Sequence, residues 1–265
     1  MPIRVGCHDF NWIPYASKRG ETLDLERVLA ELVQAGYEAV EFSAVPFETD
    51  DPARTAELLR KYGLELTGMS FSYRGEENAL EILKGRARLL AEWGGRVGVF
   101  LDGSGRRRKR ELTEDDFREI GQLAGAVAEY AASLGLDTVV HNHLGTIVES
   151  THDLDRFLKY APACGLCLDT GHLIPKGENP ADAVRRYRDI LRHVHFKDTG
   201  LKPDGTFEEF VDLGTGNHRY SLEGVLRELK TVRYDGWLVV EQDHTRSTPL
   251  LSARADRDYL KKHGF

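Results

Sequence analysis

The chain has 265 residues, of which 41% are hydrophobic and 30% charged, and its formal net charge is −7. This composition is typical of a soluble globular protein, and no apolar run reaches the roughly 20 residues that a membrane span requires. The negative charge gives no general attraction to a phosphate backbone, so neither a nucleic acid nor a membrane is an expected partner. The three cysteines and the absence of a signal-peptide pattern favour a cytoplasmic protein.

Short β-rich runs alternate with longer amphipathic runs along the whole chain. Strands are predicted at 3–8, 38–42, 65–71, 96–101, 137–141, 166–169, 193–196 and 237–241, and helices at 23–35, 52–62, 78–93, 114–134, 154–160, 180–191, 222–232 and 253–262. Eight such βα units, without a Gly-rich phosphate loop after the first strand, favour closure into a barrel over an open doubly wound sheet. The sequence therefore predicts an α/β protein with one domain over residues 1–265, a single (β/α)8 TIM barrel.

A basic run, Arg-Arg-Arg-Lys-Arg at 106–110, lies between the fourth strand and an acidic helix start. Two interpretations remain open. It is either a solvated loop or a loop near the barrel mouth that attracts an anionic substrate group or a partner subunit.

Polar residues occur where the predicted strands end. In a TIM barrel the active site is assembled at the C-terminal ends of the strands, and a solvated surface charge has no reason to follow that register. Seven strands carry such a residue, namely His8, Glu41, Ser70, His141, Asp169, His195 and Glu241.

The fifth unit contains two histidines, His141 and His143, followed by Glu149. Residues i and i+2 of an extended segment project to the same side. One histidine alone is more often a structural residue than a ligand, but a histidine pair followed by a carboxylate indicates a site. The Gly-Thr break at 145–146 would allow Glu149 to turn back toward the barrel mouth.

The sixth unit places Asp169 at the end of an apolar strand and His172 three residues later. Asp169 is also a good helix N-cap, which is its structural alternative, but a cap would not require His172.

The last two units complete the polar set. His193, His195 and Lys197 alternate with apolar residues and would face the barrel interior, where such groups are costly unless they are paired or bound to a metal. Glu241 ends an apolar strand. Carboxylates combined with imidazoles suit one divalent ion, with Mn²⁺ first and Co²⁺, Fe²⁺ or Zn²⁺ possible, whereas Mg²⁺ fits less well.

Four sequence blocks, at 141–149, 168–172, 193–198 and 236–243, resemble the xylose isomerase-like superfamily of sugar isomerases, epimerases and dehydratases, which includes endonuclease IV. The blocks are most similar to those of inosose dehydratases. The resemblance implies a metal held by Glu149, Asp169, His195 and Glu241. Many relatives have Glu at the fifth strand end, where this chain has His141, so His141 is the alternative to Glu149.

The expected chemistry begins with a metal that polarises the carbonyl of a keto-sugar or keto-cyclitol and stabilises an enediolate. His143 or His172 is the candidate general base or acid, because imidazoles transfer protons near neutral pH. The remaining candidates orient or surround the substrate. Glu41 and Lys197 are predicted to orient hydroxyls, His8 and His141 to contact the substrate, and Trp12, Phe71 and Trp237 to form an apolar wall, with core packing as their alternative.

Three classes of function follow from this site. The first is an inosose dehydratase-like lyase acting on a small carbohydrate or cyclitol, with an isomerase or epimerase using the same residues as its main rival. The second is an abasic-site nuclease similar to endonuclease IV, which the acidic chain disfavours. The third is a non-catalytic binding barrel. A homo-oligomer is possible, since barrels of this kind often associate.

Overall fold

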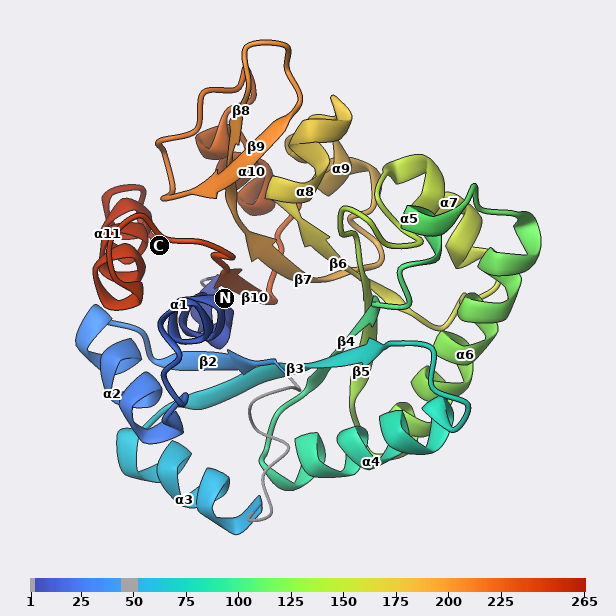
Figure 1. Ribbon diagram of the computed structural model, residues 1–265, viewed down its shortest axis with the longest axis horizontal. Coiled ribbons are helices and arrows are strands. Elements are labelled where there is room, and N and C mark those ends of the chain that lie inside the picture. Colours follow the sequence, from blue (N-terminus) through green and yellow to red (C-terminus); the bar gives the residue numbers. More distant parts are fainter. Residues whose placement is uncertain (1–2, 44–51) are drawn as a thin grey trace.

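The computed structural model describes residues 3–43 and 52–265, and it shows eight parallel strands in a closed barrel surrounded by helices (Figure 1). The barrel order is β1-β10-β7-β6-β5-β4-β3-β2. Its strands are β1 (Arg4–His8), β2 (Ala39–Phe42), β3 (Glu65–Tyr73), β4 (Val97–Asp102), β5 (Asp137–His141), β6 (Gly165–Asp169), β7 (Leu191–Phe196) and β10 (Trp237–Val240). The prediction of a (β/α)8 TIM barrel is confirmed.

The helices that follow the strands also lie close to their predicted ranges. They are α2 (Leu25–Ala35), α3 (Pro52–Tyr62), α4 (Ala79–Glu92), α6 (Glu114–Ser133), α7 (Thr151–Leu158), α9 (Pro180–Arg186), α10 (Leu222–Thr231) and α11 (Pro249–Lys262). Short additional turns are η1 (Asp9–Asn11), α5 (Arg106–Lys109), α8 (Thr170–Leu173) and η2 (Ile174–Lys176). Among the described residues, no helix is both long and apolar enough to cross a membrane.

Two larger insertions were not predicted. Helix α1 (Trp12–Arg19) follows the first strand after the turn η1, and an antiparallel hairpin of β8 (Asp198–Leu201) and β9 (Phe207–Val211) follows the seventh strand. The hairpin stands outside the ring of barrel strands, beside α8 and α9 (Figure 1). Both insertions lie on the side of the barrel where the strands end, so they add walls to the region in which a site is expected.

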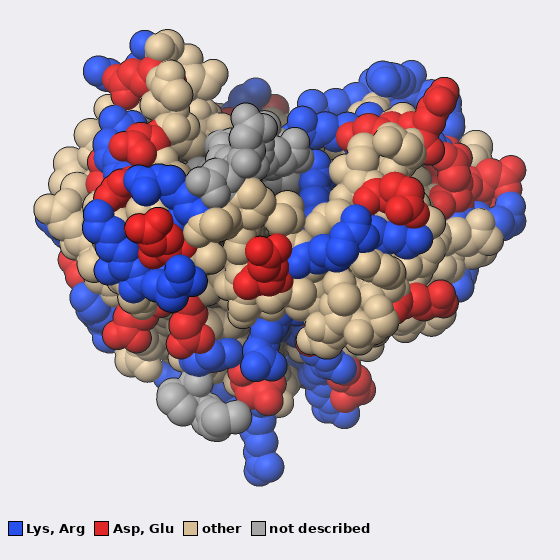
Figure 2. Space-filling model, turned by 90° about the horizontal axis from the view of Figure 1, so that it is seen from below, with Lys and Arg blue, Asp and Glu red and all other residues tan. Residues whose placement is uncertain are grey.

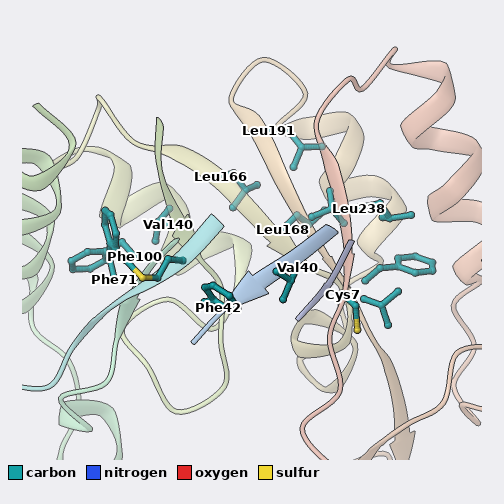
Figure 3. Close-up of a cluster of buried hydrophobic side chains, with 14 of the residues drawn as sticks. Cys7, Val40, Phe42, Phe71, Phe100, Val140, Leu166, Leu168, Leu191 and Leu238 are labelled. Atoms are coloured by element: carbon teal, nitrogen blue, oxygen red, sulfur yellow. The ribbon is translucent and has the colours of Figure 1, made fainter. Parts of the chain in front are cut away.

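Side chains alternate between the two faces of the barrel wall, as the period of a strand requires. Outward-facing residues such as Val40, Phe71 and Leu238 form the main hydrophobic core between the strands and the helices (Figure 3). A smaller apolar group fills the barrel interior, made of Val97, Val99, Val139 and Cys167. Further along the same inward faces, toward the strand ends, the residues become polar.

The basic run at 106–110 forms α5 and its C-cap and binds mainly to the protein itself. Arg106 and Arg110 both donate hydrogen bonds to the buried carboxylate of Asp116. Arg107 donates to the carbonyl of Thr146 at 2.7 Å and pairs with Asp153. These three arginines are therefore bound to protein acceptors, although Arg110 remains exposed to solvent.

Asp116 is expected to be important for stability. Its carboxylate accepts hydrogen bonds from the Thr113 backbone N–H at 2.8 Å and from Arg110 at 2.7 Å, and these contacts hold the pKa of Asp116 well below its usual range. Asp116→Asn should lower the free energy of unfolding by about 2 kcal/mol, because it weakens a helix cap and several charge-assisted bonds at a buried position. Urea unfolding measures this loss. Asp115→Asn is the control, since Asp115 is a neighbouring exposed carboxylate, and an equal effect of both changes would contradict the prediction.

Candidate metal centre

Four buried side chains converge at the ends of four strands. His141 ends β5, Asp169 ends β6, His195 lies on β7, and Glu241 directly follows β10. Each offers one ligand atom, and these atoms all lie within 4.8 Å of one another. His195 Nδ1 lies 2.7 Å from Glu241 Oε2, and His141 Nε2 lies 3.6 Å from Asp169 Oδ2. The order β10-β7-β6-β5 places the four strands side by side, which explains how residues far apart in the chain meet.

Unsatisfied polar atoms indicate what this cluster binds. Asp169 Oδ2, His195 Nδ1 and Glu241 Oε2 are buried and make no hydrogen bond of good geometry, and their near neighbours include one another and the Lys197 ammonium. Burying polar groups without well-formed hydrogen bonds costs several kcal/mol, so such groups normally face a ligand, a water or a metal. Two imidazoles and two carboxylates are a donor set that first-row divalent ions accept. The residues therefore fit a divalent metal ion.

The protonation state of His141 agrees with this interpretation. Burial, reinforced by the neighbouring His195, holds the pKa of His141 well below its ordinary value, so His141 is neutral and able to ligate. Burial raises the pKa of Asp169 to about 7, although the nearby Lys197 opposes this rise. A divalent cation would keep the Asp169 carboxylate ionised.

Glu149, predicted as the fourth ligand, does not lie with the other three, and His141 takes that place. The Glu149 carboxylate accepts a hydrogen bond from the Gly145 backbone N–H and one from Lys176 Nζ at 3.0 Å, and it lies near Arg107. Gly145 has a φ of +80°, so the chain does turn after β5. The turn directs Glu149 toward the side chains of Lys176 and Arg107 rather than into the barrel. This corrects the earlier assignment.

Glu41 is hydrogen-bonded to the candidate ligand His195. Glu41 Oε1 lies 2.9 Å from His195 Nε2, and Glu41 Oε2 lies 2.5 Å from His193 Nε2. Burial disfavours its charge, but His195 and His193 hold the pKa of Glu41 well below its usual value. A carboxylate that accepts the second N–H of a metal-bound imidazole fixes its tautomer and raises its basicity. Glu41 was predicted to orient a substrate hydroxyl. Its two carboxylate oxygens are instead bound to the protein's own histidines.

Glu41→Gln is expected to weaken metal binding about 10- to 100-fold, because the amide cannot accept a hydrogen bond from both histidines. Competition with a chelator measures the dissociation constant. Glu38→Gln is the matched control, since Glu38 is an exposed carboxylate three positions earlier in the chain. Unchanged metal affinity in a folded Glu41→Gln protein would show that Glu41 has no orienting role.

Beside the ligand cluster, the histidines His143 and His172 stack with ring centroids 3.8 Å apart. His143 Nδ1 lies 2.7 Å from the Leu144 carbonyl oxygen, to which it donates, so Nε2 is left as the free acceptor. Burial lowers the pKa of both imidazoles and keeps them neutral. His143 lines the central cavity, whereas His172 lies behind it against Phe210 of the β8–β9 hairpin.

Lys197 is a fully buried cation next to the ligand cluster. Its Nζ lies 3.3 Å from Glu241 Oε2, 3.4 Å from Asp169 Oδ2 and 2.9 Å from Asp243 Oδ1. Burial opposes its charge, but Asp169 and Asp243 raise the pKa of Lys197 above its ordinary value. Lys197 also donates to His172 Nε2 at 3.3 Å. The side chain therefore orients protein groups on one side of the site, and it supplies a fixed positive charge there.

A cavity of about 250 Å³ opens above the ligand cluster. Pockets for drug-sized ligands measure about 300–1,000 Å³, so this volume suits a single sugar or cyclitol ring. The predicted residues His8, Glu41, His141, His143, His195 and Glu241 line it, together with residues that the sequence reasoning did not single out for the site, namely Phe10, Ser43, Ser72, Arg74, Val99, Leu101 and Gly103. Ser70, which the strand-end pattern did include, also lines it.

The three aromatic residues predicted as a substrate wall lie elsewhere. Trp12 is buried in α1 and donates to Glu31, and Phe71 faces the outer core. Trp237 lies at the start of β10, at the opposite end of the barrel, with the Arg4 guanidinium 3.9 Å above its ring. Core packing, the alternative for each, is correct for Trp12 and Phe71, and Trp237 packs in the barrel interior with Ala39 and Val239.

Comparison with known proteins shows the family to which the chain is similar. A family model described as the xylose isomerase-like TIM barrel matches residues 29–263. The chain belongs to this family. An inosose dehydratase from Lacticaseibacillus casei is 27% identical over 293 aligned positions, which cover 98% of this chain and 97% of that protein. The family assignment confirms the resemblance seen in the four sequence blocks, and relatives of this kind are lyase- or isomerase-type enzymes that modify sugars.

Solved structures share the xylose isomerase-like fold. An L-ribulose 3-epimerase has a TM-score of 0.78 at 19% identity and covers 99% of this chain and 94% of its own. The IOLI protein with a bound zinc atom has a TM-score of 0.77 at 13% identity and covers 98% of both chains. At these identities the likeness concerns the fold.

Proposed function

We propose that the protein is a divalent-metal-dependent lyase that dehydrates a keto-cyclitol or keto-sugar. The observation that carries the proposal is the full-length similarity to inosose dehydratases in a chain whose buried His141, Asp169, His195 and Glu241 fit a metal ion. Mn²⁺ remains our first choice of metal, and a cytoplasmic location remains a proposal.

A metal held by these four residues would polarise a carbonyl and an adjacent hydroxyl and so acidify the neighbouring C–H bond. His143 Nε2 faces the cavity as an unprotonated acceptor, and it takes the proton from that carbon. The C–H electrons first form an enolate, which either takes the proton back or re-forms the carbonyl while the new C=C bond forms and the β-hydroxyl leaves. The proton on His143 passes to this hydroxyl, which departs as water, and the product is a conjugated enone.

Lys197 and Glu41 support this chemistry by holding other side chains of the site, and neither contacts the substrate. Lys197 holds Asp169, Glu241 and Asp243 in place, and Glu41 holds His195. Two further groups of described residues could hold a cation. The buried ammonium of Lys197 lies next to one of them, His143–His172–Asp243, and in the other the Glu41 carboxylate already accepts from both His193 and His195. This arrangement favours one metal ion over the larger metal set of an endonuclease IV-like nuclease.

The surface also favours a small substrate over a nucleic acid. Figure 2 shows acidic and basic side chains interspersed over the visible face, and the chain has a net charge of −7. Nucleic-acid binding generally requires a coherent basic surface.

An epimerase that uses the same metal site is the second candidate, and one observation favours it. Epimerisation removes a proton from one face of a carbon and returns one to the other face, so it needs proton carriers on opposite walls. His8 ends β1 and His143 follows β5, and these strands lie opposite each other in the barrel order, while both histidines line the cavity.

The test is metal analysis coupled to turnover of a panel of keto-inositols and ketoses. Dehydration creates new ultraviolet absorbance and releases one water, whereas epimerisation changes only stereochemistry and is seen by chromatography. Absorbance that grows in a metal-dependent manner supports the lyase. Epimer formation without absorbance would replace it with the second candidate, and tight binding without turnover would indicate a binding barrel.

A further inference from the structure

One face of β3 continues the polar lining of the cavity from the barrel interior to its mouth. Ser70, Ser72 and Arg74 alternate with Phe71 and Tyr73, so the three polar residues share a face of the extended chain. All three line the cavity that also contains the candidate metal ligands His141, His195 and Glu241. The serines are half-buried, and Arg74, directly after the strand, is exposed.

The local structure holds this row in place. Ser70 Oγ and Ser72 Oγ lie 2.8 Å apart in a hydrogen bond, which leaves further donor and acceptor capacity on both hydroxyls. The Arg74 backbone N–H donates to Glu76 at 2.8 Å, which fixes the turn after β3. Gly103 lies against the Arg74 side chain, because a Cβ there would lie 3.4 Å from Arg74 Cγ.

The Arg74 guanidinium is not held in an ion pair. Within residues 3–43 and 52–265 it makes no hydrogen bond or ion pair, although the nearby Glu76 carboxylate interacts with its charge, whereas Arg106, Arg107 and Arg110 near the mouth are each bound to acidic groups. Among the described residues that line the cavity, Arg74 is also the only lysine or arginine. A guanidinium presents paired donors that match a carboxylate or a phosphate.

We propose that Arg74 is a specificity residue that binds an anionic substituent of the substrate, a carboxylate or a phosphate monoester, while Ser70 and Ser72 bind its hydroxyls. This inference rests on the proposed function, because it places the substrate carbonyl at the candidate metal centre. The substrate class is then a polyhydroxylated ketone that carries one negative charge or more, rather than a neutral sugar.

The test compares three substrates with the metal-loaded protein. They are a polyhydroxylated cyclohexanone with a ring carboxylate, its neutral counterpart and a ketose phosphate, so the two anions are distinguished from each other. Arg74→Met should lower kcat/KM for the preferred anion about 10- to 100-fold, mainly through a higher KM, and leave the neutral compound unaffected. Arg60→Met is the matched control, because Arg60 is an exposed arginine at the opposite end of the barrel.

Higher ionic strength should raise the KM of the anion for the wild type but not for Arg74→Met. If the wild type turns over none of the compounds, the proposed lyase activity fails, and calorimetric titration with the two anions tests Arg74 separately through the ratio of dissociation constants. Equal affinity of the wild type and Arg74→Met for both anions, or no binding of either anion, would overturn the inference. Equal kcat/KM for the neutral and charged cyclohexanones would overturn it as well.

Discussion

Replacing His195 with alanine is expected to remove both the bound metal and the turnover of any keto-sugar or keto-cyclitol. His195 is central to the candidate metal centre, since its Nδ1 faces Glu241 at 2.7 Å and its Nε2 is held by Glu41. A metal Lewis acid contributes several kcal/mol to transition-state stabilisation, so the loss in kcat/KM should be at least about 10³-fold. Elemental analysis of the purified protein gives the metal content, and the substrate panel gives the activity.

The alanine change also leaves the buried Glu41 charge with fewer partners and is expected to reduce stability, so a milder variant is needed beside it. Asp169→Asn keeps the size of the side chain and the acceptor that caps α8, where Asp169 Oδ1 accepts from the His172 backbone N–H. Only the Oδ2 position, which faces Lys197 and the other candidate ligands, changes its chemistry. Asp169→Asn should fold normally and still lose metal and activity. A folded variant of either kind with full metal content and full activity would contradict the site.

Three of the four residues that converge were predicted as ligands from the family resemblance, and strand periodicity had independently placed them at the barrel mouth. A polar residue at the C-terminal end of an inward-facing row must lie at the barrel mouth, and Asp169, His195 and Glu241 all meet that condition. The same rule applies to His141, which ends β5. Glu149 does not meet it, because it lies eight residues beyond the strand, and the path of a turn is set by contacts such as those of Lys176 that periodicity does not contain.

The aromatic predictions were wrong for reasons that the same rule could have revealed. Phe71 lies between Ser70 and Ser72, so it must face the opposite side of the wall from the two serines. Trp237 shares the inward face with Glu241 but lies four residues earlier, which is about 13 Å deeper along a strand. Parity and depth along each strand therefore carry more information than residue type, and they would have selected Ser72 and Arg74.

The β8–β9 hairpin and helix α1 had no comparable signal. Both begin within a few residues of a strand end, and each contains too few residues for a periodic hydrophobic pattern to be recognised in the sequence. The hairpin nevertheless completes the site, since Phe210 packs on His172 with ring centroids 4.8 Å apart and lies under the Lys197 ammonium. The sequence alone left His143 and His172 equivalent, and it is this covering of His172 that separates them.

His143→Gln is accordingly expected to abolish proton transfer while leaving the metal in place. General acid–base catalysis by one side chain contributes about 10²–10⁴-fold, so kcat should fall by that factor with little change in KM. Exchange of the substrate α-hydrogen with deuterated solvent reports the proton-transfer step itself, and it should fall in parallel with kcat. The metal content should equal that of the wild type, which distinguishes this variant from His195→Ala.

Two further variants make the assignment of the base specific. His152→Gln is the control, because His152 is an exposed histidine on α7. His172→Gln should retain solvent exchange to a much greater extent, since His172 lies behind His143 and accepts from Lys197 rather than facing the cavity. If His172→Gln loses exchange while His143→Gln keeps it, the roles are reversed. The orientation of His143 by the Leu144 carbonyl would then serve packing, and the proton would have to travel through the buried side of the site.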